Sequence, residues 1–112
     1  MKNELFSCRS LYKHHSKKKA SANRTFEERI VLIRAKSFKD ALIQAEKEAE
    51  QYCRQIKTCT YLGHVDAFII HDKPLKHGSE IYSLLRESGL TEAAYIRRFF
   101  ETGKEYQSEI CF

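Results

Sequence analysis

The stretch TFEERIVLIRAKSFKDALIQAEKEAEQYCRQI, residues 25–56, contains the strongest strand pattern and the strongest helix pattern of the chain. Its first part, Thr25–Lys36, is rich in β-branched residues, which favour extended backbone. Four apolar residues, Ile30–Ile33, follow one another without interruption. Such a run is typical of a strand that is buried on both faces. We therefore expect this strand to be covered on both faces, or at least to be central in its sheet.

The second part of the stretch predicts an amphipathic helix that begins after Ser37. Ser37 is a favourable N-cap residue, and Asp40, three residues later, completes a variant of the capping box. Apolar residues at helical spacing form one continuous stripe, which we expect to pack on a sheet. The stripe consists of Phe38, Ala41, Leu42, Ala45, Ala49, Tyr52, Cys53 and Ile56.

Before this stretch, residues 5–13 (LFSCRSLYK) predict another strand, because Phe6, Cys8 and Tyr12 alternate with their neighbours and share one face. Residues 13–24 (KHHSKKKASANR) show no apolar periodicity and predict the loop that joins the two strands.

After the helix, residues 58–71 (TCTYLGHVDAFIIH) predict a third strand, with Gly63 marking a bulge or bend. A turn around Pro74 precedes residues 79–85 (SEIYSLL), which predict a strand that returns along the sheet.

Thr91 is well placed to cap a second helix that ends near Gly103. The apolar face of this helix consists of Tyr95, Ile96, Phe99 and Phe100. Residues 104–112 either dock on the body through Ile110 and Phe112 or form a short edge strand.

The element order predicted by these patterns is β-β-α-β-β-α. Two hairpins separated by a helix give an α+β fold with a mainly antiparallel four-stranded sheet and helices packed on one face. A chain of 112 residues is long enough for one core, so we expect a single domain over residues 1–112.

The net charge of +5 lies in the loop at residues 13–24, which contains no acidic residue. The chain has 20 basic and 15 acidic residues, and five of the basic ones lie in this loop. The rest of the chain therefore carries equal numbers of basic and acidic residues. The functional interpretation of this loop is a contact site for an acidic protein surface or for nucleic acid. The alternative, which we favour because no aromatic residues are interleaved here for base stacking, is a solvated loop that keeps the hairpin soluble. The candidate partner-binding residues are Lys13, Lys17, Lys18, Lys19 and Arg24.

The cysteines and the N-terminus indicate a reducing compartment. The first residues lack the apolar core of a signal peptide, and no apolar run is long enough to span a bilayer, so we expect a cytoplasmic protein without membrane insertion. In that compartment we expect free thiols. The four cysteines are Cys8, Cys53, Cys59 and Cys111.

No arrangement of residues in the sequence is typical of an active site. Cys53 and Cys59 are six residues apart, wider than the paired spacing of structural zinc sites, and we predict neither a metal nor a cofactor. His64 and Asp66 lie on the same face of the third predicted strand. An ordinary solvent-exposed face has the same arrangement. Glu28 and Glu80, near strand starts, are candidate buried carboxylates for acid–base chemistry. The alternative, which we favour, is that they form ion pairs with Arg29, Arg34 or Arg86.

Three parts of the sequence resemble a known family. They are Thr25–Lys36, the helix with Ala41 and Ala45 in register, and the segment GSEIYS at residues 78–83. Together they are similar to the small bacterial domain of unknown function DUF4288, over roughly residues 4 to 85. The resemblance implies a bacterial α+β domain and supplies no mechanism.

These observations favour a non-catalytic protein-binding module, of the kind that serves as an immunity or antitoxin-type protein in bacterial toxin systems. The alternative is a nucleic-acid-binding domain that uses the loop at residues 13–24. We expect no enzymatic activity.

Overall fold

The computed structural model describes residues 3–15 and 25–105, which form a three-stranded sheet, one long helix and a C-terminal arm. The strands are β1 (Glu4–His14), β2 (Thr25–Ala35) and β3 (Cys59–Ile70), and the helix between β2 and β3 is α1 (Phe38–Arg54). The arm, residues 79–100, runs in extended conformation to a short helix, α2 (Glu92–Tyr95), and a π-helical turn, η1 (Ile96–Phe100).

The sheet has the order β2-β1-β3, and both pairings are antiparallel. β1 is therefore the central strand and β2 lies at an edge, which contradicts the expectation that the apolar run Ile30–Ile33 is central or covered on both faces. Ile33 is buried against α1, whereas Ile30 and Leu32, on the opposite face, are exposed. The run is apolar on both faces although α1 covers only one of them.

The core lies between the sheet and α1, where the predicted helix stripe is confirmed. Three helix alanines have no exposed surface, and because they are small they let the helix lie close to the strands. Phe6 and Cys8 of β1 pack in one cluster with Ala41 and Ala45. The alanines are Ala41, Ala45 and Ala49.

Local hydrogen bonds explain where α1 begins. The Ser37 hydroxyl accepts a hydrogen bond from the Asp40 backbone N–H at 3.1 Å. The Asp40 carboxylate accepts one from the Lys36 backbone N–H at 3.0 Å. The predicted N-cap is confirmed, and the carboxylate reaches one residue further back than in the usual capping box.

The predicted four-stranded sheet and the β-β-α-β-β-α order are wrong, because residues 79–85 form no strand. This segment follows residues 71–78 and lies over β1 and β3 on the face opposite α1, which we call the open face. Tyr82 packs edge-on against Phe68, and the Ser7 hydroxyl donates a hydrogen bond to the Ile81 carbonyl. These side-chain contacts hold the segment across the face of the sheet, where its backbone cannot pair with an edge strand.

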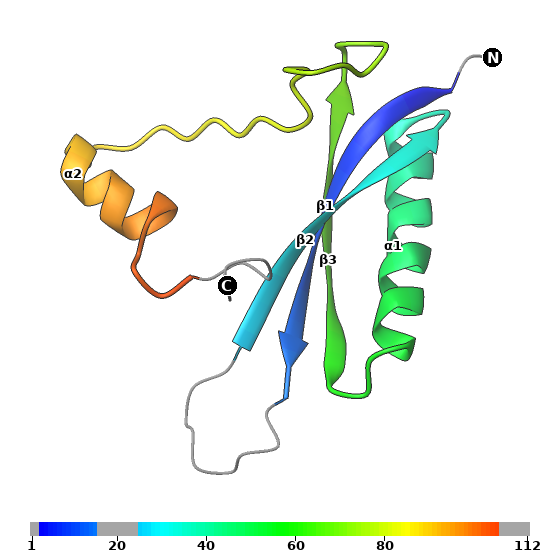
Figure 1. Cartoon of the computed structure of the whole chain (residues 1–112), viewed down its shortest axis with the longest axis horizontal. Helices are drawn as coiled ribbons and strands as arrows, with labels where there is room; N and C mark the ends of the chain where they lie inside the picture. Colours follow the sequence, from blue (N-terminus) through cyan, green and yellow to red (C-terminus); the bar gives the residue numbers. More distant parts are fainter. Residues whose placement is uncertain (1–2, 16–24, 106–112) are drawn as a thin grey trace.

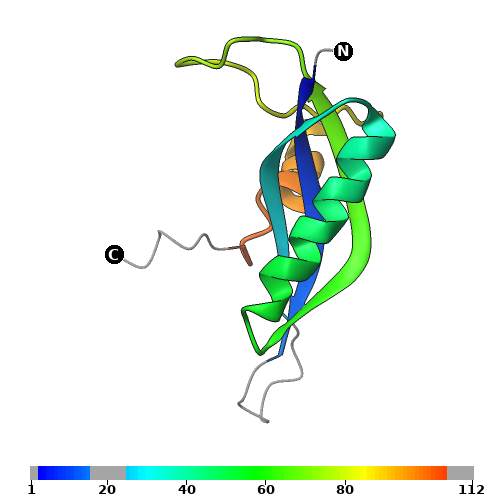
Figure 2. The same cartoon turned by 90° about the vertical axis from the view of Figure 1, so that its right-hand side faces the viewer.

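The second helix is capped by Thr91 as predicted, since the threonine hydroxyl accepts a hydrogen bond from the Ala94 backbone N–H. Its predicted position is wrong. Figure 1 shows α1 on one side of the sheet and α2 on the other, at the far end of the extended part of the arm. Figure 2 shows the same layers with α1 in front and α2 behind. The helices therefore do not pack on one face, and the apolar face of α2 and η1 is exposed at Ile96, Phe99 and Phe100.

The predicted irregularity at Gly63 is confirmed. The register of β1 with β3 shifts between Ser10 and Tyr12, opposite Gly63, which has a φ of 77°. Side chains disfavour this left-handed conformation, whereas glycine adopts it readily.

Candidate functional site

The open face carries a cavity of about 550 Å³ near the middle of β1. Every strand and the arm contribute to it. Its lining consists of Arg9, Ser10, Leu11, Glu28, His64, Val65, Asp66 and Arg86.

Arg9 is the residue that organises this cavity. It lies opposite Asp66 in the register of β1 with β3, and its Nη2 donates to Asp66 Oδ2 at 2.8 Å. Its Nη1 lies 3.4 Å from Glu28 Oε1 on the other neighbouring strand. The hydrogen bond to Asp66 raises the pKa of Arg9 above its ordinary value. The arm adds the Tyr82 ring, whose centroid lies 5.6 Å from the guanidinium carbon.

The charges around the cavity are balanced. Arg9 and Arg86 are matched by Glu28 and Asp66, and both carboxylates are solvated, with 65% and 51% of their side chains exposed. A cavity that binds a phosphate or a polyanion needs an excess of positive charge. The arginines and the carboxylates of this lining are equal in number and give no such excess.

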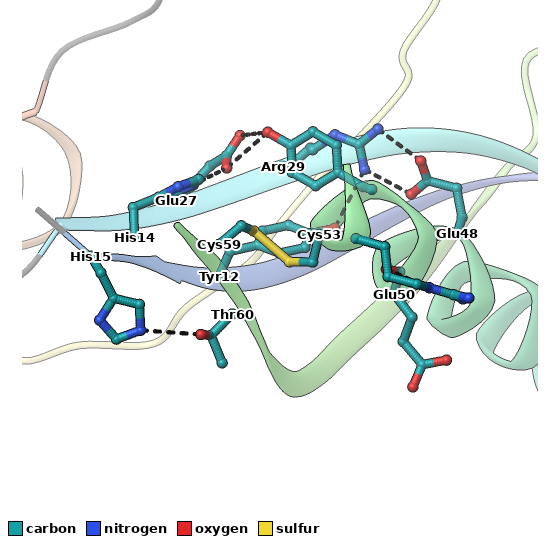
Figure 3. Close-up of a disulfide and its surroundings, with 12 residues drawn as sticks. Tyr12, His14, His15, Glu27, Arg29, Glu48, Glu50, Cys53, Cys59 and Thr60 are labelled. Atoms are coloured by element: carbon teal, nitrogen blue, oxygen red, sulfur yellow. Dashed lines mark hydrogen bonds and ion pairs between the residues drawn. A yellow bond between two sulfur atoms is a disulfide. The ribbon is translucent and has the colours of Figure 1, made fainter. Parts of the chain in front are cut away.

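A second polar cluster lies on the α1 side of the sheet, near the end of the β1–β2 hairpin (Figure 3). The Tyr52 hydroxyl donates to the Glu27 carboxylate at 3.0 Å, and His14 Nε2 lies 2.7 Å from the same carboxylate. Burial, together with this hydrogen bond, raises the pKa of Tyr52.

Arg29 extends this cluster along the helix. Its guanidinium makes two hydrogen bonds of 2.7 Å to the Glu48 carboxylate and lies 3.8 Å from the centroid of the Tyr52 ring. It also donates to the Tyr12 hydroxyl at 3.3 Å. The hydrogen bond to Glu48 is the largest reason why the pKa of Arg29 is raised. These contacts join β2 to α1, so the cluster holds the helix on the sheet.

A disulfide joins Cys53, near the end of α1, to Cys59, at the start of β3 (Figure 3). The expectation of free thiols is therefore wrong for these two cysteines. Cys8 is free and fully buried, as its place in the apolar pattern predicted. Burial raises the pKa of its thiol to about 11, with a smaller contribution from Asp66. Cys111 lies outside the described residues.

A model of the DUF4288 family, a domain of unknown function, matches residues 5–83. The chain belongs to the DUF4288 family. The match covers the three strands, α1 and the start of the arm, and it ends before α2. No curated protein and no solved structure matches the chain.

The predicted basic contact site can be placed only in part. In this DUF4288 chain Lys13 is half-buried near the end of β1, whereas Lys17, Lys18, Lys19 and Arg24 lie outside the described residues. The neighbouring His14 is paired with the Glu27 carboxylate. The proposal that this loop binds a partner stays a prediction.

The prediction that Glu28 and Glu80 are buried carboxylates is wrong for both. Glu28 is largely exposed beside Arg9, and Glu80 is exposed in the arm. Glu28 does form an ion pair, but its partner is Arg9 and none of the arginines that the sequence suggested, since Arg29 is held by Glu48.

His64 and Asp66 both line the cavity, as their common strand face indicated. Arg9 was not predicted as a site residue, and Arg86 was named only as an ion-pair partner of Glu28 or Glu80. Arg9 is a charge within a strand whose other face is apolar, and that alternation placed it on the open face. Within residues 3–15 and 25–105, no group of three or more His, Cys, Asp and Glu side chains is arranged to hold a metal ion.

Proposed function

We propose that this DUF4288 domain is a non-catalytic protein-binding module that binds its partner through the open face of the sheet and the arm. The observation that carries the proposal is a set of large apolar side chains that are exposed on these two elements. Soluble monomers rarely expose extended apolar surface, and where they do it often marks a site of protein contact. The exposed side chains are Phe26, Ile30, Leu32, Ile81, Leu84, Leu85, Leu90, Ile96, Phe99 and Phe100.

The cavity supports the same proposal. It is lined by residues of all three strands and by Arg86 of the arm, with charges of both signs. An apolar surface with a polar pocket is the usual composition of a protein interface, in which one partner side chain is anchored in the pocket.

We also propose that the chain is a bacterial protein of the immunity or antitoxin type and that it is located in the cytoplasm. The described part of the chain contains no helix with the length and apolar character needed to cross a membrane. The Cys53–Cys59 disulfide weighs against a permanently reducing compartment, where such bonds are rare. The thiol state of Cys53 in cells therefore tests the location: a fully oxidised pool would refute a cytoplasmic protein.

Site-specific photo-crosslinking in the native host tests the binding surface. A photoreactive phenylalanine replaces Leu85, which is 92% exposed in the arm; the matched control places it at Lys39, exposed on α1. We expect one discrete protein adduct at position 85 that survives nuclease treatment, and none at position 39. Equal adducts at the two positions, or no adduct at position 85, would refute the proposal.

A further inference from the structure

The outer edge of β2 is unpaired in the described part of the chain. β2 pairs with β1 along all eleven of its residues, in a register without interruption. It therefore presents a long, regular row of backbone N–H and C=O groups on its other side. Soluble proteins usually block such edges with proline, lysine or a bulge, because an open edge pairs readily with another strand.

β2 has no proline, no lysine and no bulge, and the two charged side chains on its open face, Glu28 and Arg34, have opposite signs. Its sequence, TFEERIVLIRA, has no proline, no lysine and no glycine. The opposite edge of the sheet, β3, is interrupted by the register shift at Gly63. The two edges therefore differ, and β2 is the edge that another strand can extend.

The side chains of β2 indicate which strand fits this edge. Two copies of β2 that pair antiparallel about a two-fold axis through Val31 place Ile30 opposite Leu32 of the second copy on the open face. The same register places Glu28 opposite Arg34. Both pairs occur twice because of the symmetry, and both join compatible side chains: apolar with apolar, and acid with base.

Neighbouring registers lack this match. With the axis through Ile30, Glu28 faces Leu32 and Arg34 faces Phe26. With the axis through Leu32, Arg34 faces Ile30. An axis through Arg29 brings the two Arg29 side chains together. Only the register centred on Val31 matches the exposed apolar pair and the exposed charges at once.

We propose that two copies of this chain form a dimer by antiparallel pairing of their β2 strands, centred on Val31. The two three-stranded sheets then become one continuous sheet of six strands. In the monomer, 46% of Ile30 and 53% of Leu32 are exposed, and both gain an apolar neighbour in the dimer. Glu28 contacts Arg9 at 3.4 Å and keeps 65% of its side chain exposed, so it remains accessible to Arg34 of the second copy. The inference does not use the arm, but it shares Glu28 with the lining of the cavity and Ile30 and Leu32 with the proposed binding surface. The crosslink at position 85 tests the arm, so a monomeric chain that still forms this crosslink would refute the dimer alone.

Sedimentation of the full chain over a range of concentrations tests the dimer. We expect a species of twice the 13.2 kDa chain mass. The variant Arg34→Glu places two carboxylates opposite each other at both ends of the interface, and we expect the dissociation constant to rise roughly tenfold or more. The matched control is Lys39→Glu, which makes the same change of charge on α1, away from β2, and leaves the dimer intact.

Charge exchange tests the register. Glu28→Arg weakens the dimer in the same way as Arg34→Glu, by placing two arginines opposite each other. The double variant E28R/R34E restores both ion pairs and therefore restores the dimer. An equimolar mixture of the two single variants also forms a dimer, since each chain then supplies the charge that the other lacks. A monomeric wild-type chain, or a dimer that these exchanges leave unchanged, would overturn the proposal.

Discussion

The Cys53–Cys59 disulfide provides the sharpest test of how the end of α1 is held on β3. Reduction of the bond, or the double variant C53S/C59S, removes a covalent link between residues six apart in the sequence. A cross-link stabilises a fold mainly because it restricts the unfolded chain, and for a loop this short the chain-entropy relation gives about 2 kcal/mol. For a domain of about 100 residues, that loss lowers the melting temperature by on the order of 10 °C.

The assay is urea denaturation followed by circular dichroism, with and without dithiothreitol. The double variant is the control: it should be as unstable as the reduced wild-type protein, and reductant should not change it further. Because Cys8 is free, its oxidation state does not differ between the two conditions. A wild-type protein whose unfolding free energy changes by only a few tenths of a kcal/mol on reduction would refute the reasoning. So would a double variant that responds to reductant.

Four further results are expected. Ala45→Leu inserts a larger side chain at a site with no exposed surface and should destabilise the protein by about 1–3 kcal/mol in urea titrations, whereas Lys39→Leu should not. Cys8, whose pKa is about 11, should stay unmodified by iodoacetamide at pH 8 until the protein is unfolded; prompt labelling would contradict its burial. Burial, with a hydrogen bond to Glu46, raises the pKa of Tyr61 from 10.0 to about 12, so the folded protein keeps a proton that the unfolded chain loses. The unfolding free energy should therefore fall as the pH rises from 10 to 12, and this slope should be shallower in Tyr61→Phe. If the basic loop binds nucleic acid, replacing Lys17, Lys18 and Lys19 with alanine should abolish a low-salt gel shift; a shift that is unchanged would exclude that alternative.

Local patterns in the sequence were sufficient to predict the elements around the core. Ser37, the helix stripe and the alternation of Phe6, Cys8 and Tyr12 are each set by neighbours within a few residues, and each is confirmed. The family was also predictable from the sequence, since the resemblance covers nearly the same residues as the match at 5–83.

The features that local sequence patterns did not predict depend on contacts formed in the folded chain. Residues 79–85 have strand character, but Tyr82 packs on Phe68, and this contact holds the segment across the sheet. The run Ile30–Ile33 suggested a central strand, yet nothing in a local pattern says whether a second layer covers it. Cys53 and Cys59 are joined because backbone turns after α1 bring the start of β3 back to the end of the helix, with hydrogen bonds from the Ile56 N–H to the Cys53 carbonyl and from the Cys59 N–H to the Ile56 carbonyl. The spacing of the two cysteines alone does not indicate these turns.

The candidate site was only partly predictable for the same reason. His64 and Asp66 share a strand, so their common face was visible from their spacing. Arg9 and Glu28 lie on different strands, and their ion pair depends on the pairing register of β1 with β2.

Arg29 has a consequence for how sequences of this domain change through evolution. One guanidinium binds both oxygens of Glu48, stacks on Tyr52 and donates to Tyr12. A lysine has a compact ammonium group instead of a planar guanidinium, so it can form few of these contacts. We therefore expect positions 29 and 48 to covary across homologues, keeping the arginine–glutamate pair or losing both members together.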